Sequence, residues 1–237
     1  MNNSPIKLLT FDLDDTLWDV GAVVRRADRE MMNWLALHYP QLVAQFDQAG
    51  FFALRREVHA ANPDIRHDLG ALRLRTLELA LHRSGHDLAT AQQGATDAFA
   101  VFFRWRNSVE FFPDVMASLQ ALRPLYPLYA LSNGGADIAH MGLGHIFSLH
   151  LSAASVGAAK PDPAMYRQAL QHAGLEPAQA IHIGDHPQED IAAAQQLGMK
   201  TIWVNRQGKD WPLEQRADAE VSDFTNLPAL IRQLAGD

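Results

Sequence analysis

The stretch "FDLDDTLWD", residues 11–19, leaves an apolar run and then places four aspartates within eight positions. The segment "IKLLTF", residues 6–11, is apolar enough for a buried β-strand that ends at Asp12. Carboxylates gathered this closely repel one another unless a positive partner lies among them. The stretch therefore predicts a strand whose carboxyl end provides a place for a cation.

The composition indicates a globular protein with a substantial core. The chain has 237 residues, of which 48% are hydrophobic, and this suits one large domain or a domain that carries an insertion. Its formal charge of -7 offers no general basic field for nucleic acid, so we expect no nucleic-acid partner. We expect a small-molecule partner, and a monomer or a homodimer.

Two features absent from the sequence limit the possible chemistry and the possible location of the protein. The sequence contains no cysteine, which excludes disulfides, thiolate metal sites and cysteine nucleophiles. The start "MNNSPIKLLTF" has no basic segment followed by a long apolar run, and no other segment approaches the roughly 20 apolar residues that span a bilayer. We therefore expect a cytoplasmic protein without a membrane partner.

Residues 20–108 have the pattern of helices alone. Apolar residues recur at three- and four-residue spacing, and "YP", "NPD" and "SGHD" interrupt the pattern. The helical segments are residues 22–39, 41–61, 67–85 and 95–107. This part of the chain predicts a bundle of about four helices that ends before Pro113.

After Pro113, strand patterns alternate with helical ones, which is typical of a parallel sheet covered on both faces. The expected strands are residues 126–133, 147–156, 179–185 and 200–205, with a short helix after the first of them. The strand at residues 6–11 has no partner in the helical part, so it joins this sheet. The sequence thus predicts an α/β fold with a Rossmann-like core, residues 1–17 and 113–237, and an inserted all-helical domain (a four-helix bundle), residues 18–112.

Polar residues follow the expected strands at the edge where open parallel sheets bind ligands. In strand order they are Asp12 and Asp14; Ser132 and Asn133; Lys160; and Asp185 and Asp190. Each group alone is an ordinary turn or helix cap. Their coincidence on successive strand ends is what predicts a functional site.

Phosphoryl transfer is the chemistry that uses this set of side chains. Asp12 can attack phosphorus and form an aspartyl phosphate, which divides one difficult displacement into two easier ones. Asp185 can hold a hard divalent cation, while Lys160 and the turn at residues 132–134 neutralise the phosphoryl oxygens. Asp14 is the candidate for the acid that protonates the leaving oxygen and later activates water.

The motifs "DLDDT", "LSN", "KPDP" and "GDHPQED" resemble, in this order, the four motifs of the haloacid dehalogenase-like hydrolases. The resemblance implies a magnesium-dependent phosphatase in which Asp12 is the nucleophile and a metal ligand. Asp14 would be the acid/base, with its backbone carbonyl on the metal, and Asp185 would complete the protein's metal ligands. Dehalogenases of the family lack the second aspartate, because a halide leaving group needs no proton, so Asp14 favours a phosphatase.

The resemblance also implies roles for the remaining motif residues. Ser132, Asn133 and Lys160 would bind the phosphoryl group, Lys160 taking part in catalysis as well. Thr16 would help to hold the first loop. Asp190, with Glu189 as the alternative, would orient Lys160 or a metal-bound water. The helical insertion resembles the all-helical cap of one branch of the family, with hinges near residues 18–21 and 108–113.

Within the insertion, "ANPDIRHDLGALRLRTLELAL" and "FFRWRN" resemble, more loosely, phosphatases that act on flavin mononucleotide (FMN) and on the ribitylaminouracil phosphate of riboflavin synthesis. This implies FMN or a riboflavin-pathway phosphate as the substrate. Arg66, His67, Arg73 and Arg106 are the candidate contacts, although a solvated helix face is the favoured explanation for each of them.

Three alternatives stay open at this point. A nucleotidase or a phosphomutase would use the same core residues, and the mutase would also have to exclude water between its two half-reactions. A catalytically silent binding module would keep the fold without turnover, although Asp12, Asp14 and Lys160 are all present.

Overall fold

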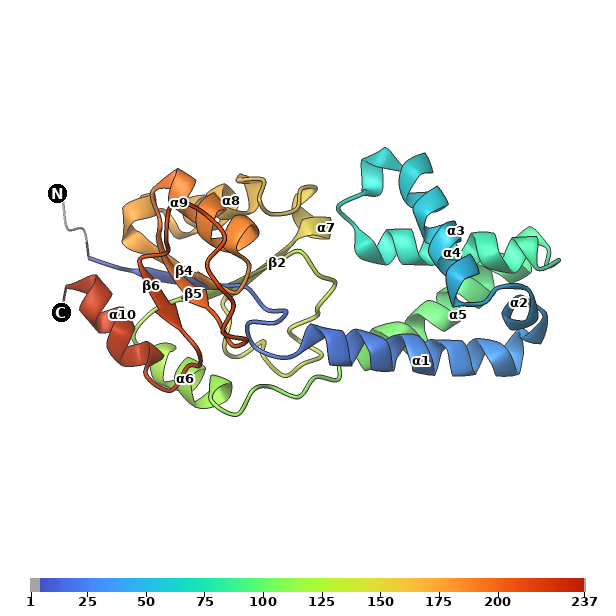
Figure 1. Ribbon diagram of the computed structural model, residues 1–237, viewed down its shortest axis with the longest axis horizontal. Helices are drawn as coiled ribbons and strands as arrows, with labels where there is room; N and C mark the ends of the chain where they lie inside the picture. Colours follow the sequence, from blue (N-terminus) through green and yellow to red (C-terminus); the bar gives the residue numbers. More distant parts are fainter. Residues whose placement is uncertain (1–4, 237) are drawn as a thin grey trace. The chain divides into compact units, whose positions relative to one another are not determined.

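The structure, a computed structural model, describes residues 5–236. Among these residues is a six-stranded sheet of parallel neighbours in the order β3-β2-β1-β4-β5-β6 (Figure 1). The strands are β1 (Leu8–Phe11), β2 (Leu128–Ser132), β3 (Leu149–Ser152), β4 (Ala180–Gly184), β5 (Lys200–Val204) and β6 (Ala219–Val221). The predicted α/β class with a parallel, Rossmann-like sheet is confirmed.

β1 lies in the middle of the sheet although it is the first strand of the chain. It pairs with β2 and β4 so that Phe11 is level with Ala130 and Ile183. The sheet continues to β3 on one side and to β5 and β6 on the other, which makes β1 the point where the winding of the chain reverses. Ligands of open α/β sheets bind at this point, beyond the carboxyl ends of the strands. Asp12 is the first residue beyond β1.

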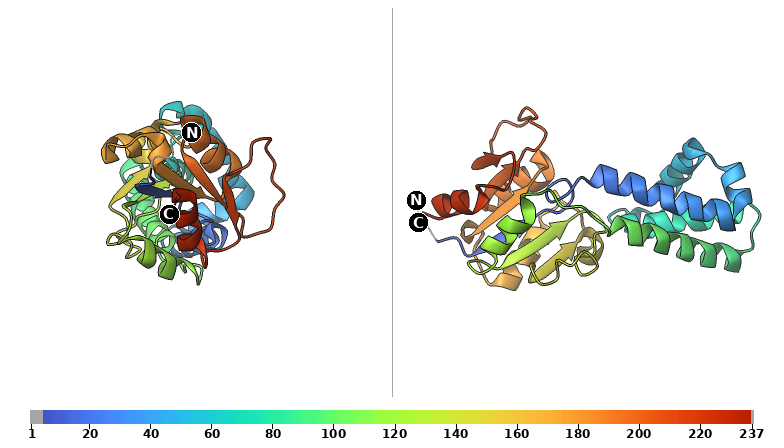
Figure 2. Two further views of the ribbon diagram at one scale, coloured as in Figure 1. Left: turned by 90° about the vertical axis from the view of Figure 1, so that its left-hand side faces the viewer. Right: turned by 90° about the horizontal axis from the view of Figure 1, so that it is seen from below.

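Helices cover the sheet on both faces (Figures 1 and 2). On one face lie α8 (Ala164–Ala173) and α9 (Ala193–Leu197), and on the other lie α6 (Val115–Leu122) and α10 (Leu227–Ala235). The rings of Phe147 and Phe224 pack against that of Phe11, with centroids 6.0 and 6.2 Å away. All four residues of β1 are buried, so both faces of this strand are covered, as its apolar and uncharged residues predict.

Residues 20–109 form a separate compact unit made of helices. The helices are α1 (Val20–His38), α2 (Pro40–Gln45), α3 (Gln48–Ala61), α4 (Leu69–Arg83) and α5 (Leu88–Arg106), with a 3-10 turn at Pro63–Ile65. Asp47, Asp68 and Asp87 each accept a hydrogen bond from a backbone N–H of the helix that follows. The segment 41–61, expected as one helix, is two because Asp47 caps α3.

The chain passes from one unit to the other at residues 19–20 and 109–110. Inside the core unit, the two connecting segments are joined by a 2.9 Å hydrogen bond from the Phe112 N–H to the Leu17 carbonyl. Arg206 holds the same region, because it pairs with both oxygens of Asp114 and lies over the Phe112 ring. None of the helices in residues 5–236 combines the length and the hydrophobicity that a bilayer crossing demands.

Two expected details of the core unit are wrong. Turns occupy residues 138–146 where a short helix was expected, and the strand expected to reach Val156 ends at Ser152. The side chains of Ser152 and Ser155 each bond the other's backbone N–H, and this capping box starts α7 (Ala153–Val156). The helix α10 and the short strand β6 were not expected; β6 has only three residues, and so short a segment shows no strand periodicity.

Candidate active site

Asp12 stands at the carboxyl end of β1 and is only 7% exposed. Its backbone N–H donates to the Ile183 carbonyl of β4 at 2.9 Å, which fixes the turn out of the sheet. Its Oδ1 accepts a 2.6 Å hydrogen bond from the Nζ of Lys160, a buried lysine. Burial raises the pKa of Asp12 well above its ordinary value; Lys160 opposes this shift, and the charges of Asp190 and Asp185 add to it.

Lys160 is shared between two buried carboxylates. The same Nζ donates a second 2.6 Å hydrogen bond to Oδ1 of Asp190. Burial opposes the charged form of Lys160, but the two carboxylates prevail and raise the pKa of the amine well above its ordinary value. Burial also opposes the charged form of Asp190, yet Lys160 and His182 together hold the pKa of Asp190 below its ordinary range. One ammonium balances one carboxylate, so Asp12, when it is ionised, leaves the group with a net negative charge.

Asp190 is held in place by its backbone and by its neighbours. It lies in a π-helix, Pro187–Ala192, that follows β4 almost directly. Its Oδ2 accepts a 2.9 Å hydrogen bond from the His186 N–H. A Cβ at Gly184 would lie 2.4 Å from the Asp190 Cγ, so only glycine leaves the space that this carboxyl group occupies. The glycine of the "GD" pair therefore has a packing reason.

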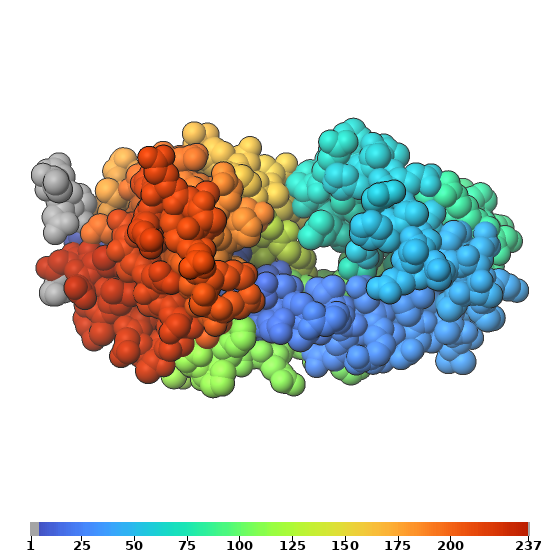
Figure 3. Space-filling view, viewed as in Figure 1, coloured from blue at the N-terminus to red at the C-terminus, as the bar shows by residue number. Residues whose placement is uncertain are grey.

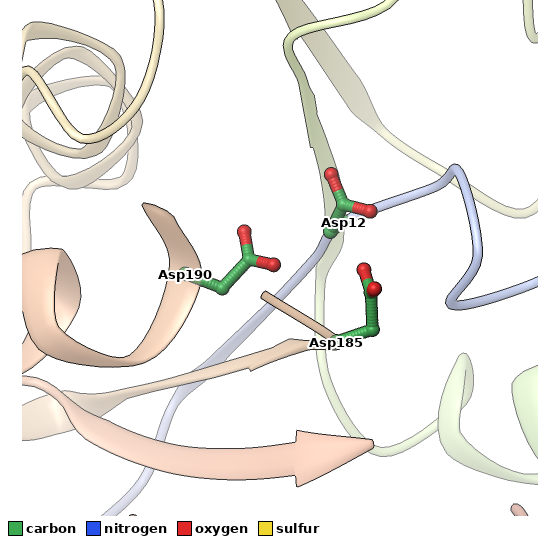
Figure 4. Close-up of side chains that lie close together, drawn as sticks. All are labelled: Asp12, Asp185 and Asp190. Atoms are coloured by element: carbon green, nitrogen blue, oxygen red, sulfur yellow. The ribbon is translucent and has the colours of Figure 1, made fainter. Parts of the chain in front are cut away.

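Asp185 faces the same space from the end of β4. Its Oδ1 lies 3.4 Å from the Thr16 hydroxyl, and its carbonyl accepts a 2.8 Å hydrogen bond from the indole N–H of Trp203. Carboxylate oxygens of Asp12, Asp185 and Asp190 lie within 4.8 Å of one another, and Figure 4 shows the three groups turned toward one another. Burial, with the charges of Asp190 and Asp15, raises the pKa of Asp185 to about 7.

Ser132 and Asn133 have different surroundings at the end of β2. Ser132 is buried, and its Oγ accepts a 2.9 Å hydrogen bond from the Gly134 N–H. The Asn133 amide holds the main chain of Lys160, donating to its carbonyl at 2.9 Å and accepting from its N–H at 2.7 Å. It also donates to the carboxylate of Glu189 at 2.8 Å. Asp190, and not Glu189, is thus the acid that contacts the Lys160 ammonium.

The other aspartates of residues 11–19 have different surroundings in the structure. The Asp14 carboxylate accepts a 3.0 Å hydrogen bond from the indole N–H of Trp18. Asp15 has a φ of 59°, in the left-handed region that aspartate adopts more readily than most residues. Asp15 and Asp19 line a hollow of about 250 Å³ that also includes Asp185. Asp12 is the aspartate of this stretch whose carboxylate accepts from the Lys160 ammonium.

The donor set fits a hard divalent cation. With Asp12, Asp185 and Asp190 ionised and Lys160 charged, three negative charges and one positive charge leave a net charge of minus two. Carboxylate oxygens are the protein ligands that Mg²⁺ prefers, and one or two of them commonly hold it together with substrate phosphate. Both oxygens of Asp190 already accept hydrogen bonds, whereas Lys160 bonds one oxygen of Asp12, so Asp12 and Asp185 are the side chains best placed to bind such an ion.

The four candidate contacts in the helical unit have different surroundings. Arg73 forms a 2.5 Å ion pair with Asp28 and lies over the Phe102 ring. Arg106 is buried at the end of α5. Arg66 and His67 lie in the turn before α4, where Arg66 donates to the His59 carbonyl at 3.4 Å. Arg73 thus has a structural task within the helical bundle.

Sequence reasoning missed a hollow of about 430 Å³ in the helical unit, lined by residues of α1 and α3. These two helices lie next to each other on the face that Figure 3 shows. Phe51 and Phe52 supply aromatic surface to the hollow, and Arg25, Arg29 and Arg55 supply positive charge. Helical periodicity alone gave no signal, because each arginine fits a solvated helix face.

Known proteins match nearly the whole chain. The family model described as haloacid dehalogenase-like hydrolase matches residues 6–198. The chain is 32% identical to the 5-amino-6-(5-phospho-D-ribitylamino)uracil phosphatase YigB of Escherichia coli K12, covering 95% of this chain and 96% of that protein. It is 30% identical to a phosphoserine phosphatase of Thermus thermophilus, covering 94% and 98%. A crystal structure described as a 2-haloacid dehalogenase from Pseudomonas syringae pv. Tomato is 39% identical, with a TM-score of 0.93 and coverage of 96% and 99%.

Proposed function

Because the chain belongs to the haloacid dehalogenase-like hydrolases, we propose that it is a magnesium-dependent phosphomonoesterase that hydrolyses a small phosphorylated metabolite through an aspartyl phosphate. The observation that carries this proposal is the arrangement of Asp12, Lys160 and Asp185 at the end of the sheet. It combines a carboxylate nucleophile, a fixed ammonium and donors for a divalent cation. Named phosphatases among the relatives support it.

The motif residues of the core unit have different roles in the proposed reaction. The Asp12 carboxylate attacks phosphorus, and the ester oxygen leaves. Lys160 keeps the Asp12 carboxylate in one orientation and adds positive charge beside the phosphoryl oxygens. Ser132 accepts from the Gly134 N–H, so its own hydroxyl hydrogen is available to a phosphoryl oxygen. Asp12, Asp185 and the Asp14 carbonyl would hold a magnesium ion, which would supply the remaining positive charge.

Asp14 is proposed as the acid and base of the two steps. In the first step, while Asp12 attacks phosphorus, the Asp14 carboxyl group gives its proton to the ester oxygen that leaves. In the second step, the Asp14 carboxylate takes a proton from the water that attacks the phosphoaspartate. The indole N–H of Trp18 bonds Oδ1 of Asp14 and so fixes the direction of the carboxyl group.

The helical unit is proposed as the cap that selects the leaving group, and FMN or a riboflavin-pathway phosphate as the substrate. The E. coli relative is by name a phosphatase of 5-amino-6-(5-phospho-D-ribitylamino)uracil, and its match extends over both units of the chain. The hollow with Phe51, Phe52 and Arg55 offers surfaces on which a planar, polar ring can stack.

A phosphate-release screen tests the function and separates the alternatives. FMN, nucleoside monophosphates and sugar phosphates are incubated with the protein, once with Mg²⁺ and once with excess chelator. We expect release only with Mg²⁺, greatest for FMN or a riboflavin-pathway phosphate, and restored when Mg²⁺ exceeds the chelator. Greatest release from nucleotides would identify a nucleotidase, and isomerised sugar phosphate a mutase. No release from any ester would overturn the proposal.

The crystal structure described as a dehalogenase adds one arm to that screen. A halide leaving group needs no proton, so dehalogenation gives no task to Asp14. Incubation with a 2-haloacid, followed by halide detection, is expected to show no release. Halide release without phosphate release would make this chain a dehalogenase.

Magnesium affinity is expected to weaken below about pH 7. Burial raises the pKa of Asp185 to about 7, and a carboxylate has to lose its proton before it binds a metal ion. Above that pH the group is already ionised; below it, each pH unit reduces the affinity by up to about tenfold, because one proton must be displaced. The indole of Trp203 bonds the Asp185 carbonyl, so tryptophan fluorescence can follow a Mg²⁺ titration.

The control for this titration is Asp185→Asn, which has no proton to lose and is expected to bind Mg²⁺ weakly at every pH. Its unfolding curve checks that the fold is kept. An affinity of the unaltered protein that does not change between about pH 5 and about pH 8 would contradict the role of Asp185.

A further inference from the structure

A buried imidazole lies beneath the site, and none of the roles above uses it. His182 on β4 and Thr10 on β1 are paired in the register of the sheet, and both are 0% exposed. The two ring nitrogens of His182 face different partners: Nε2 lies 3.2 Å from Oδ1 of Asp190, and Nδ1 lies 2.8 Å from the Thr10 hydroxyl. The ring thus connects the strand that carries Asp12 to the acid that holds Lys160.

These contacts define where the proton of the ring lies. The ionised Asp190 carboxylate can only accept, so Nε2 of His182 has to carry the hydrogen. Burial lowers the pKa of His182, although Asp190 opposes that shift, so the ring is neutral and its Nδ1 is bare. The bare nitrogen accepts from the Thr10 hydroxyl. A hydroxyl can donate or accept, and that of Thr10 also lies 3.4 Å from the Ile181 carbonyl, so Asp190 selects the tautomer and Thr10 supports it by donating to Nδ1.

The donor from His182 completes the hydrogen bonding of Asp190. Oδ1 of Asp190 accepts from Lys160 and His182, and Oδ2 accepts from the His186 N–H. Three donors on a carboxylate that is 1% exposed leave it no freedom to turn. The Lys160 ammonium is bonded between this fixed carboxylate and Asp12, so its own place depends on that of Asp190.

Packing alone is the competing explanation for His182. Its ring meets that of Tyr166 edge-on, with centroids 5.0 Å apart and an angle of 88° between the planes. A phenylalanine would serve that contact equally well, because it has a ring of similar size. Packing alone would not explain why both nitrogens of a fully buried ring face polar partners. Phenylalanine and glutamine at this position therefore separate the two explanations.

We propose that Thr10 and His182 form a positioning pair that, through Asp190, sets the place of the Lys160 ammonium against the nucleophile Asp12. This inference rests on the proposed function for its effect on catalysis, and on the hydrogen bonds alone for the state of the ring.

Three variants test the positioning pair by kinetics. His182→Phe keeps the ring and removes both nitrogens, whereas His182→Gln keeps an N–H donor near the place of Nε2. We expect His182→Phe to lower kcat for phosphate release by about 10-fold to 100-fold with little change in KM, because a misplaced catalytic group has effects of this size. His182→Gln is expected to recover most of the loss. Thr10→Val is expected to lower kcat severalfold alone, and to add nothing in the His182→Phe background.

The tautomer of His182 gives a readout that needs no turnover. Nitrogen-15 NMR of the histidine-labelled full chain is expected to show one buried ring protonated at Nε2 only, identified by its loss in His182→Phe. In Thr10→Val the ring is expected to stay protonated at Nε2, because Asp190 can still only accept, while the Nδ1 signal is expected to shift because that nitrogen loses its donor. If no phosphate ester is hydrolysed, the proposed function fails while this spectrum still decides the state of the ring.

Two results would overturn the positioning pair. One is a His182 ring that is protonated at Nδ1 or doubly protonated in the unaltered protein. The other is a kcat of folded His182→Phe equal to that of the unaltered protein. If His182→Phe does not fold, the nearly isosteric Thr10→Val decides, and an unchanged kcat in that variant overturns the proposal.

Discussion

Replacing Asp12 by asparagine is expected to reduce phosphate release by about 10⁴-fold or more while the fold persists. An amide cannot attack phosphorus, so no phosphoaspartate forms. The substituted side chain keeps its size, and its oxygen can still accept from the Lys160 ammonium, which lies 2.6 Å from Oδ1 of Asp12. Initial rates with the best ester from the screen measure the effect, and circular dichroism during thermal unfolding measures the fold.

The matched control is Asp223→Asn, which makes the same chemical change at an exposed aspartate beyond β6. Its rate is expected to equal that of the unaltered protein. Trapping of labelled phosphate on the protein from a labelled ester should succeed with the control and fail with Asp12→Asn. Turnover that survives in Asp12→Asn would contradict attack by this carboxylate.

Replacing Lys160 by methionine is expected to lower both activity and stability. Methionine keeps an apolar stem but removes the ammonium that bonds Asp12 and Asp190 at 2.6 Å each. Two buried carboxylates then lack their shared cation, and breaking a buried pair in this way costs about 3–5 kcal/mol of unfolding free energy. Loss of a fixed charge beside the phosphoryl group is expected to reduce kcat by about 10²-fold to 10³-fold. Urea unfolding and phosphate release measure the two effects.

Two further variants show whether charge is the cause of that loss. Lys7→Met removes an exposed lysine and is expected to change the unfolding free energy by less than about 0.5 kcal/mol. Adding Asp190→Asn to Lys160→Met removes one of the stranded carboxylates and is expected to restore part of the stability but not the activity. A Lys160→Met protein as stable as the unaltered one would contradict the ion-pair account.

The positions of the motif residues could be predicted because they depend on strand order and spacing. Asp12, Ser132 and Asp185 each come at the end of a strand that the apolar pattern reveals, and parallel strands bring these ends to one edge. The conformation of Asp15 also follows from chemistry, since aspartate tolerates the left-handed region that its φ of 59° requires.

The contacts among those residues could not be predicted, because they depend on local backbone geometry. The segment after Asp185 has the pattern of an ordinary helix, yet a π-helix turns Asp190 back over Gly184 and onto Lys160. The hydrogen bonds from the Asn133 amide to the Lys160 main chain were not predicted, because sequence spacing does not show how the two turns pack. The contacts of His182 could not be predicted either, since nothing in a single sequence shows what its two ring nitrogens face.

The hydrogen bond between Phe112 and Leu17 affects how the inserted segment of this chain can change in length during evolution. It holds the two ends of a long insertion next to each other within the core unit, as a hairpin holds the ends of its loop. The entropic penalty of closing a loop grows only with the logarithm of its length, so a large insertion costs the core little more than a small one. The helical unit can therefore be lengthened, shortened or exchanged between residues 19–20 and 109–110 without changing the pairing register of any strand in the sheet. Under the proposed function, the residues for the reaction and those for substrate choice would therefore lie in separate segments of the chain that can vary independently.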